Sequence, residues 1–458
     1  MSPGRLVDLS RSRRVHIVGA GGAGMSAIAT VLASMGHRVS GSDLKESPVL
    51  SRLRLLGVDV WVGSRPEALQ GVEVLATSTA VPERDPEVAG AGQLGIEVLT
   101  RAAMLASIAA QRKVIAVSGT HGKTTTTSML ALILVEAGLR PSFMIGGDVN
   151  EIGTNALWDS GEWLVIEADE SDGTFLEIAT ELAVVTNVEA DHLDYYGGFD
   201  ELVDAFSRFT TAARQVAVAG SDNEVAARLV SGTGGVTAGT SQGSTYQVVD
   251  LATSPDGSTF GVEHAGSRLA SVKLAVPGVH NALNAVVAVA AASEIGVPPE
   301  AAESALARFA GVARRFEARG EARGVRFVDD YAHLPGEVSA VIEAARTWEP
   351  ERLVVVFQPH RYTRTAALYE SFADCFEGAD ALVVTEVYAA GEPPLPGIGG
   401  HLVADTVSRA HPDMPVTFVP GRADVARVVG QMLRPGDLCL SLGAGDLTTL
   451  ADEVISSW

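Results

Sequence analysis

A lysine inside a glycine- and threonine-rich run is the feature of this sequence that most directly indicates chemistry. The run Gly119-Thr120-His121-Gly122-Lys123-Thr124-Thr125-Thr126 follows an apolar stretch at 114–117, and a helix is expected over 128–137. Backbone N–H groups in such a turn and at the start of the helix can surround a phosphate, the lysine adds a cation, and a threonine hydroxyl can reach Mg²⁺. The run therefore predicts a nucleotide phosphate site, although Val117 stands where the common phosphate-loop pattern has glycine.

A run of carboxylates follows the predicted strand at 163–166. Its sequence is Glu167-Ala168-Asp169-Glu170-Ser171-Asp172. Oxygen ligands of this kind suit Mg²⁺, and ATP sites pair a loop threonine with a carboxylate at a neighbouring strand end. A solvated acidic loop is the alternative. His192 follows the strand at 182–186 in the same region, which favours a metal or phosphate role over a purely structural one.

Three glycines near the amino terminus form a second candidate site. Gly19, Gly21 and Gly24 make the pattern G-x-G-x-x-G after a strand at 15–18, and Asp43 ends the next strand. Such a turn serves any diphosphate placed at a helix start. The pattern is compatible with a dinucleotide, with another nucleotide diphosphate or with simple packing, and we favour the second.

Polar residues also follow strands in the last third of the chain. Asp330 and His333 follow one strand, and Arg361 and Arg364 follow another. Two arginines three residues apart on the first turn of a helix can grip one carboxylate, and a solvated helix start is the alternative. Upstream, the segment from Asn281 to Asn284 begins a predicted helix. These amides could cap the helix or recognise an adenine edge, and the spacing does not separate the two.

Composition indicates a globular protein with several cores. The chain has 458 residues, which suggests about two to four domains. Its net charge of −22 opposes binding to nucleic acid and to anionic membranes. A lysine in the glycine-rich run stands out because the only lysines are Lys45, Lys113, Lys123 and Lys273.

The sequence shows no pattern typical of a secretory signal or of a membrane-spanning segment. Residues 1–14 include basic residues without a following apolar segment, and no apolar run approaches the roughly 18 residues of a membrane span. Cys375 and Cys439 have apolar neighbours and are expected to be reduced core thiols. We therefore expect a soluble cytoplasmic protein.

Strands and helices alternate along three successive α/β regions, with junctions near Gln111 and at 311–316. Strands are expected at 15–18, 38–43, 72–77, 163–166, 182–186, 326–328, 353–357, 381–385 and 438–442. A Gly-, Ser- and Thr-rich stretch at 231–270 contains short alternating segments and indicates a β-meander. Helices are expected to end near Met35, to cover 280–295, and to begin at Pro298-Pro299. Ligands of open α/β sheets bind at the carboxyl ends of strands, where the polar residues above occur.

Together these motifs resemble the Mur ligase family, the ATP-dependent ligases that build the peptide stem of peptidoglycan. The likeness covers essentially the whole chain, and the run from Gly119 to Thr126 corresponds to the family's phosphate loop. The runs that most resemble family members acting on L-alanine are 19–25, 167–172, 357–365, 387–392 and 442–446.

The resemblance implies three α/β domains. These are a Rossmann-like UDP-sugar domain at 1–110, a central P-loop ATPase-type domain with a small extra β-meander at 111–312, and a Rossmann-like amino-acid domain at 313–458. It further implies that ATP and Mg²⁺ drive the joining of L-alanine to the carboxylate of UDP-N-acetylmuramate through an acyl phosphate. No nucleic acid partner is implied, and the protein would be a monomer or homodimer.

The resemblance also implies roles for individual residues. Lys123 would hold the β- and γ-phosphates, Thr124 and Glu167 one Mg²⁺, and His192 a second; Lys123, Glu167 and His192 would be catalytic. Residues that would contact ATP are Gly119, Thr120, His121, Gly122, Lys123, Thr124, Thr125, Asn281, Asn284, Arg315 and Asp330. Residues around the UDP-sugar would be Gly21, Gly22, Gly24, Asp43, Ser78, Gly153, Thr154 and Asn155. His333, Arg361 and Arg364 would hold the amino acid.

Two positions depart from the family pattern. Leu334 replaces the usual second histidine after His333, and the absence of any lysine between Lys123 and Lys273 rules out the carbamylated lysine of several relatives. The second departure fits members that add alanine. Three alternatives remain: a ligase that reattaches recycled tripeptide, an NAD-dependent oxidoreductase motivated by Gly19 to Gly24, and a non-catalytic nucleotide-binding regulator. The run 358–361 argues against the first, and the lysine-containing loop is unexplained by the second.

Overall fold

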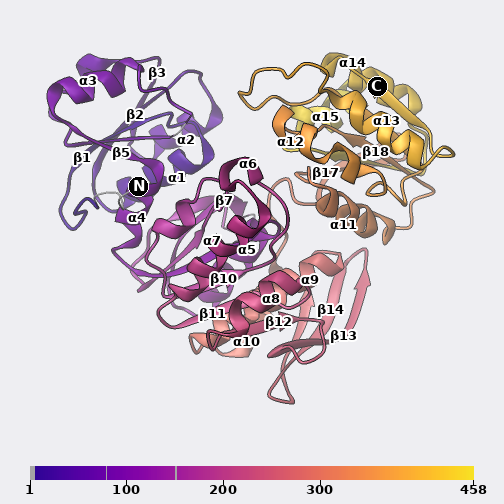
Figure 1. The fold of residues 1–458 in the computed structure, drawn as a ribbon, viewed down its shortest axis with the longest axis horizontal. Coiled ribbons are helices and arrows are strands. Elements are labelled where there is room, and N and C mark those ends of the chain that lie inside the picture. Colours follow the sequence, from indigo (N-terminus) through magenta and orange to yellow (C-terminus); the bar gives the residue numbers. More distant parts are fainter. Residues whose placement is uncertain (1–5, 79, 150–151) are drawn as a thin grey trace. The chain divides into compact units, whose positions relative to one another are not determined.

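The computed structural model describes residues 6–78, 80–149 and 152–458 and contains three β-sheets with flanking helices (Figure 1). The chain divides into two compact units. The first comprises residues 1–249, 261–272 and 283–309, and the second comprises residues 250–260, 273–282 and 310–458. The predicted α/β class with three sheet-containing regions is confirmed.

The first sheet has five parallel strands in the order β3-β2-β1-β4-β5. Its elements are β1 (Arg14–Val18), α1 (Ala23–Ser34), β2 (Arg38–Asp43), α2 (Pro48–Leu55), β3 (Asp59–Val62), η1 (Pro66–Leu69), β4 (Val74–Thr77), α3 (Pro86–Leu94), β5 (Glu97–Thr100) and α4 (Arg101–Ala109). Val18 at the end of β1 pairs with Ser42 of β2 on one side and with Thr77 of β4 on the other. The glycine loop after β1 therefore emerges where the strand order reverses, the usual ligand position in such sheets.

The second sheet has ten strands in the order β15-β14-β13-β12-β11-β10-β6-β9-β7-β8. Its strands are β6 (Lys113–Ser118), β7 (Ser142–Val149), β8 (Thr154–Leu157), β9 (Trp163–Glu167), β10 (Leu182–Val185), β11 (Val216–Gly220), β12 (Val236–Gly239), β13 (Tyr246–Ser254), β14 (Gly257–His264) and β15 (Ser267–Leu274). The predicted meander is present as β13 to β15. It extends the edge of this sheet, because β12 pairs with β13.

Helices surround the second sheet. They are α5 (Lys123–Glu136), η2 (Thr174–Glu177), α6 (Leu193–Tyr196), α7 (Phe199–Thr211), α8 (Glu224–Ser231), α9 (Val279–Glu294) and α10 (Pro299–Arg308). The central strand β6 lies between β9 and β10, with Val117 paired to Glu167 and Ser118 paired to Val185. The segments that follow β9 and β10 therefore border the loop that follows β6.

The third sheet has the order β16-β17-β21-β18-β19-β20 and is parallel except for the edge strand β16. Its elements are β16 (Glu317–Ala322), β17 (Val325–Asp330), α11 (Pro335–Arg346), β18 (Arg352–Phe357), α12 (Tyr362–Leu368), η3 (Tyr369–Phe372), β19 (Ala381–Thr385), α13 (Gly400–Ala410), β20 (Val416–Val419), α14 (Arg422–Met432), β21 (Asp437–Leu442), η4 (Asp446–Thr449) and α15 (Leu450–Ser457). Val355 and Val356 of β18 belong to two separate hydrophobic clusters. Successive side chains of a strand point to opposite faces, so helices cover both faces of this sheet.

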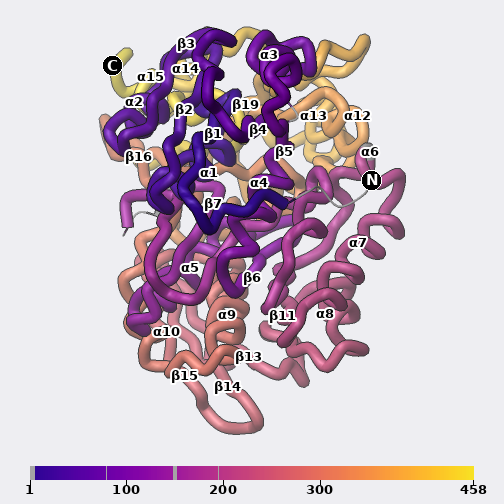
Figure 2. The backbone as a smooth tube through the Cα atoms, turned by 90° about the vertical axis from the view of Figure 1, so that its left-hand side faces the viewer, coloured from indigo at the N-terminus to yellow at the C-terminus, as the bar shows by residue number. Residues whose placement is uncertain are grey.

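Apolar packing in the first unit runs from the first sheet into the second. One hydrophobic cluster includes Ile17 and Ile28 from the first sheet region and Ile166 and Phe206 from the second. Helix α1 contacts both β7 and β8, and Figure 2 shows α1 beside β7. None of the helices among the described residues is both long and apolar enough to cross a membrane.

Candidate active site

The loop from Gly119 to Gly122 joins the central strand β6 to helix α5. Gly119 (φ 134°) and Gly122 (φ 77°) lie in the left-handed region that favours glycine. A side chain at Gly119 would collide with the hydroxyl of Thr186, and one at Gly122 would collide with the carboxamide of Asn284. Both glycines are therefore required by backbone conformation and by close approach, and Asn284 of α9 lies against the phosphate loop.

The segment after β10 holds this loop in shape. Asn187 Oδ1 accepts a hydrogen bond from His121 N at 2.8 Å, and Asn187 Nδ2 donates to His121 O at 3.1 Å. Thr120 Oγ1 accepts from Glu189 N at 2.8 Å. Because these bonds fix the loop backbone before any ligand binds, the N–H groups at the start of α5, which have no partner within the helix, are preorganised for an anion.

Helix α5 begins at Lys123, five residues before the expected start at Ser128. The β-branched threonines between these two positions have low intrinsic helix propensity. In the fold these residues are buried, and the Oγ1 of Thr127 donates to Lys123 O at 2.7 Å. Tertiary packing and bonding to the preceding turn thus outweigh propensity, and the lysine becomes the first residue of the helix.

The ammonium of Lys123 is held by three acceptors. Its Nζ donates to Gly119 O at 2.6 Å, to Thr120 O at 3.2 Å and to Glu170 Oε1 at 2.9 Å. Burial alone would lower the pKa of Lys123, but the charges of Glu170 and Asp169 outweigh it and raise that pKa to about 12. The lysine is therefore a permanent cation at the mouth of the loop.

Thr124 and Glu167 form the oxygen-rich side of the site. Thr124 Oγ1 donates to Glu167 Oε1 at 3.0 Å, and Gly146 N donates to Glu167 Oε2 at 2.7 Å. Among the described residues no group of three or more His, Cys, Asp or Glu side chains forms a metal cluster. A hydroxyl and one carboxylate nevertheless fit Mg²⁺, which usually takes one or two protein carboxylates and completes its shell with water and substrate phosphates.

His192 lies in the segment after β10, which contacts the acidic run 167–172 through Tyr196. Its Nε2 is 3.1 Å from Asp191 Oδ2. His192 is the N-cap of α6 and has a left-handed backbone conformation with φ 54°. Tyr196 donates its hydroxyl to Glu170 O at 2.5 Å. The structure thus links this segment with the carboxylate run, while no direct contact joins His192 to Thr124 or Glu167 in the described residues.

Asn281 and Asn284 lie one turn apart on α9. Asn281 Nδ2 donates to Pro277 O at 2.6 Å, so this amide fastens the first turn of the helix to the segment before it. It does not act as an N-cap, in which the side-chain oxygen would accept from a backbone N–H. Asn284 instead lies against Gly122. The structure therefore separates the two amides into one that fastens the helix and one that approaches the phosphate loop.

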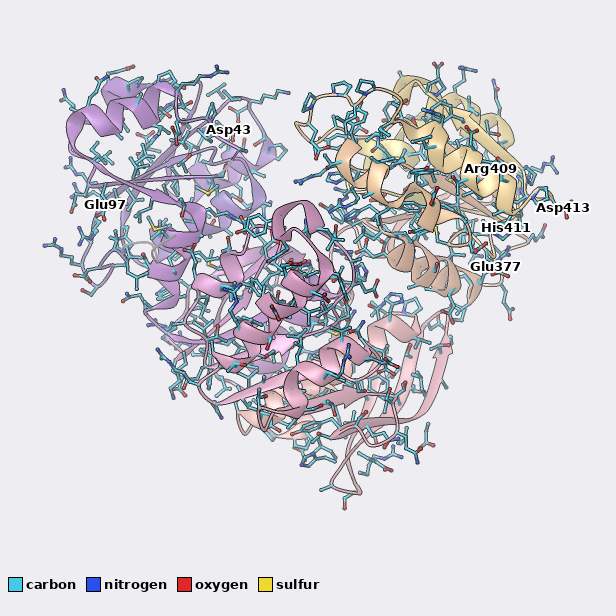
Figure 3. The ribbon with its side chains drawn as sticks, viewed as in Figure 1. Asp43, Glu97, Glu377, Arg409, His411 and Asp413 are labelled. Atoms are coloured by element: carbon cyan, nitrogen blue, oxygen red, sulfur yellow. The ribbon has the colours of Figure 1, made fainter. Side chains whose placement is uncertain are left out.

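The glycine loop after β1 is tied to the end of β2. Gly21 N donates to Asp43 Oδ2 at 2.8 Å, and Gly19 N and Ala20 N both donate to Ser42 O at 2.9 Å. Asp43 is labelled in Figure 3. Its carboxylate thus secures the loop itself, and a side chain at Gly21 would lie only 2.8 Å from Asp43 Oδ2.

Further predicted UDP-sugar residues surround this loop at different distances. Gly22 N donates to Gly19 O at 3.2 Å, and a side chain at Gly19 would lie 4.0 Å from Ser78 Oγ. Gly24, in the first turn of α1, packs against Arg101, because a side chain there would lie 3.2 Å from Arg101 Nη1. Arg101 also pairs with Asp172 at 2.9 Å, so it connects the first turn of α1 with the acidic run after β9.

The remaining predicted sugar residues lie at the turn into β8. Gly153 (φ 73°) precedes Thr154, whose Oγ1 donates to Ala156 O at 3.1 Å, and Asn155 Nδ2 donates to Ile145 O at 3.4 Å. These bonds remain within the β7–β8 region. The turn is brought toward the first sheet by the packing of β8 on α1.

In the second unit, Asp330 ends β17 and accepts two backbone hydrogen bonds. Phe316 N and Ala332 N each donate to its carboxylate at 2.7 Å. Burial raises the pKa of Asp330 to about 6, against the opposing charge of Arg315. His280 also lies near Arg315, and burial followed by that charge lowers the pKa of His280 to about 4. Arg315 thus lies near both the buried carboxyl group of Asp330 and the neutral imidazole of His280.

His333 and the two predicted arginines lie around a stack of rings. The ring of His333 is 5.4 Å from that of His360, and His360 stacks on Tyr388 at 5.7 Å. Arg364 Nη1 is 3.1 Å from His360 Nδ1. His360 therefore lies between His333 and Arg364, although sequence reasoning did not select it.

The expectation that Arg361 and Arg364 share the first turn of a helix is wrong for Arg361. This residue is the N-cap of α12, with φ 70°, and its N–H donates to Tyr388 O at 2.8 Å. The backbone turns there because that bond directs it toward the loop after β19. Only Arg364 belongs to the helix, so the geometric argument from helical spacing does not apply to the pair.

Four residues that sequence reasoning did not select contribute to these sites: Arg101, Glu170, Asn187 and His360. Glu170 and His360 lie in runs that the sequence had singled out, so their immediate neighbours were a usable signal. Arg101 and Asn187 follow strand ends, which is the general position of ligand-binding residues in α/β sheets. Nothing in their own type or spacing distinguishes them.

Family models match the chain in three consecutive segments. The "Mur ligase family, catalytic domain" matches residues 14–113, the "Mur ligase middle domain" matches 117–292, and the "Mur ligase, glutamate ligase domain" matches 314–445. Together these segments include both glycine loops and the ring stack of the second unit.

Curated relatives and solved structures agree with these matches. UDP-N-acetylmuramate–L-alanine ligase from Trichlorobacter lovleyi is 42% identical over 450 residues, covering 96% of this chain and 98% of the relative. The enzyme of that name from Geobacter sulfurreducens is 42% identical over 440 residues, covering 95% of each chain.

Among solved structures, UDP-N-acetylmuramate-alanine ligase from Thermotoga maritima superposes with a TM-score of 0.83 at 29% identity, covering 97% of this chain and 99% of that one. A murein peptide ligase from Psychrobacter arcticus has the same fold, with a TM-score of 0.70 at 24% identity and coverage of 97% and 98%. With a phosphate loop that carries Lys123 and near-complete alignment to these enzymes, the chain belongs to the Mur ligase family.

Proposed function

We propose that this protein is an ATP-dependent ligase that joins L-alanine to the carboxylate of UDP-N-acetylmuramate during peptidoglycan precursor synthesis. The observation that carries the proposal is the 42% identity, over almost the full length of both chains, to enzymes that bear that activity in their names. The phosphate loop supports it with the groups that ATP-driven acyl activation needs.

The reaction has two chemical steps. The muramate carboxylate attacks the γ-phosphorus of ATP, which forms an acyl phosphate and releases ADP. The amine of L-alanine then attacks the acyl carbon, an amide bond forms, and inorganic phosphate leaves. The protein's task is mainly to position the reactants and to neutralise charge, since two anionic substrates must meet inside an acidic protein.

Lys123 and the loop amides stabilise the transferring phosphoryl group. The N–H groups at the start of α5 would bind phosphate oxygens, and the permanent cation of Lys123 would pair with the γ-phosphate. Thr124 and Glu167 would hold Mg²⁺, and His192 would serve a second ion. Bound there, Mg²⁺ would neutralise negative charge on the phosphate oxygens. Asn284 would contact the nucleotide, and its position beside Gly122 supports this role.

The other substrates are assigned to the flanking regions. We assign residues 1–110 to the UDP-sugar, 111–312 to ATP and 313–458 to the amino acid. Gly21, Gly22, Gly24 and Asp43 would form the diphosphate site, with Ser78 and residues 153–155 nearer the sugar. His333, Arg361 and Arg364 would hold L-alanine, and Asn281, Arg315 and Asp330 would lie near adenosine. The setting of this reaction would be the cytoplasm.

Release of inorganic phosphate tests the proposal. Purified protein should release phosphate only when UDP-N-acetylmuramate, ATP, Mg²⁺ and an amino acid are all present, with L-alanine preferred in a panel that includes glycine and serine. Activity with L-alanyl-γ-D-glutamyl-diaminopimelate in place of L-alanine would instead identify a tripeptide-recycling ligase. Reduction of NAD without phosphate release would identify an oxidoreductase.

A further inference from the structure

A completely buried carboxylate lies under the amino-terminal glycine loop and has no part in the reaction described above. Glu87, in the first turn of α3, has no solvent-exposed surface, and neither does His16 of β1. A buried charge is costly unless it is paired and hydrogen-bonded. The contacts of Glu87 therefore indicate which parts of the first sheet its carboxylate stabilises.

Glu87 connects three strands and a turn. Its Oε2 accepts a hydrogen bond from the hydroxyl of Ser42 in β2 and lies 3.4 Å from His16 Nε2. Its Oε1 accepts from Trp61 Nε1 of β3 at 3.3 Å and from the backbone N–H of Arg65 at 2.7 Å. One carboxylate thus fixes the end of β2, the end of β3 and the turn that follows β3.

The end of β2 is also the support of the glycine loop. The carbonyl of Ser42, the residue whose hydroxyl bonds Glu87, accepts from the backbone N–H groups of both Gly19 and Ala20. Asp43, the next residue, accepts from Gly21 N through its side chain and from Gly63 N through its carbonyl. A shift of Ser42 would therefore move three successive loop residues together.

We propose that Glu87 is a positioning residue of the UDP-sugar site, which acts through Ser42 to hold the backbone of the glycine loop, and with it the N–H groups at the start of α1, in the geometry that binds the diphosphate. This inference rests on the proposed function, which assigns the glycine loop to UDP-N-acetylmuramate. Glu87 does not touch the substrate. Its effect should appear in the affinity for UDP-sugar and leave the other two substrates unaffected.

Steady-state kinetics with each substrate varied in turn test this role. Glu87→Ala should raise the KM for UDP-N-acetylmuramate about tenfold, the usual consequence of losing a hydrogen bond to a charged group. The KM values for ATP and L-alanine and the kcat should stay within about twofold of the wild-type values. Glu87→Gln, which keeps the shape and an acceptor oxygen, should restore most of the affinity.

Two variants separate the branches of the network. Ser42→Ala removes the link to the loop and should raise the same KM. Combined with Glu87→Ala it should add little, because both act through one contact. Trp61→Phe removes the other branch and should leave the KM for UDP-N-acetylmuramate unchanged. If Glu87→Ala fails to fold, the KM values for UDP-N-acetylmuramate of Ser42→Ala and Trp61→Phe still test the proposal. Equal KM values in these two variants would contradict it.

A buried carboxylate elsewhere provides the matched control. Asp437 is 3% exposed and pairs with Arg352 in the third sheet. Asp437→Asn should lower the melting temperature without a selective change in any KM. An equal rise of all three KM values in Glu87→Ala, or a normal KM for UDP-sugar in a folded Glu87→Ala, would overturn the positioning role.

Calorimetry with UDP keeps this test independent of turnover. Wild-type protein that binds UDP but shows no phosphate release with UDP-N-acetylmuramate, ATP, Mg²⁺ and L-alanine would contradict the proposed function alone. Wild-type protein that binds UDP, with a Ser42→Ala variant that binds it equally well, would contradict the inference alone.

Discussion

The two glycine loops of the first unit use the same backbone device and differ in the side chains around it. Each follows the central part of a parallel sheet, between strands on both sides, and each leads into a helix. The loop before α5 has Lys123 as the first helical residue, with Glu167 and Glu170 within hydrogen-bond reach of its threonine and lysine. The loop before α1 has glycine as its N-cap and no charged residue in its first turn.

The difference indicates which loop changes charge during a reaction. A loop that only binds a diphosphate needs a fixed backbone that presents the N–H groups of the following helix, and Ser42 and Asp43 fix that backbone from the neighbouring strand. A loop that transfers a phosphoryl group also needs a cation and oxygen ligands to meet developing charge. Substitutions in the two loops should therefore change different kinetic constants.

The largest effect is expected at Lys123. Lys123→Ala should lower kcat by more than about 10³-fold, by analogy with the loss of a single catalytic arginine in GTPases. Phosphate release in single turnover measures this loss. The affinity for UDP-N-acetylmuramate, measured by calorimetry, should remain near normal because the loop before α1 is unchanged. A wild-type kcat in this variant would show that Lys123 does not take part in phosphoryl transfer, and would contradict the difference proposed between the two loops.

Removal of an oxygen ligand should have the next largest effect. Glu167→Ala should lower kcat on the order of 10²-fold and raise the Mg²⁺ concentration needed for half-maximal rate, because one charge-stabilising group is lost. His192→Ala should shift the Mg²⁺ dependence in the same direction. Titration of activity with Mg²⁺ checks both, and unchanged curves would remove these residues from the metal site.

Arg361 and Arg364, in the proposed amino-acid region, provide a comparison with the two glycine loops. Arg361→Ala and Arg364→Ala should each raise the KM for L-alanine roughly ten- to a hundred-fold, since a charge-assisted hydrogen bond contributes about 1.5–3 kcal/mol. The KM values for ATP and UDP-N-acetylmuramate should change much less. If either arginine variant loses affinity for the nucleotide instead, the assignment of residues 313–458 to the amino acid is wrong.

The smallest effect is expected at Asp43. Asp43→Asn keeps an oxygen that can accept from Gly21 N and removes only the charge, so the KM for UDP-N-acetylmuramate should rise about two- to fivefold. The kcat should not change. Initial rates at varied UDP-sugar concentration provide the measurement. A loss of kcat comparable to that of Glu167→Ala would mean that the amino-terminal loop also takes part in the chemistry.

The central strands and their polar ends could be predicted because their signals are local. Residues 38–43 and 381–385 were expected as strands and form β2 and β19 with those limits. β19 is wholly buried and is a nearly continuous apolar run, as expected of a central parallel strand. The short edge strand β5, with a mostly exposed face, and the amphipathic helix α14 carry weaker patterns and were not anticipated.

Residues that act through long-range contacts could not be predicted from sequence. Glu87 meets His16 and Ser42 only after β1, β2 and α3 have assembled, and Arg101 meets Asp172 only after the first and second sheets have packed. Neither pairing has a spacing rule. The start of α5 was predicted too late for a related reason, because burial of its threonines depends on the finished core.

The three hydrogen bonds of Lys123 have a consequence for the energetics of nucleotide binding. An ammonium group has three protons, and Gly119 O, Thr120 O and Glu170 Oε1 already accept all of them. An arriving γ-phosphate must therefore displace an internal acceptor, and Glu170 is the anionic one. Binding is then an exchange of one anion for another, with little change in net pairing at the lysine. Because salt screens the departing and the arriving pair alike, the contribution of Lys123 to ATP affinity should depend only weakly on ionic strength.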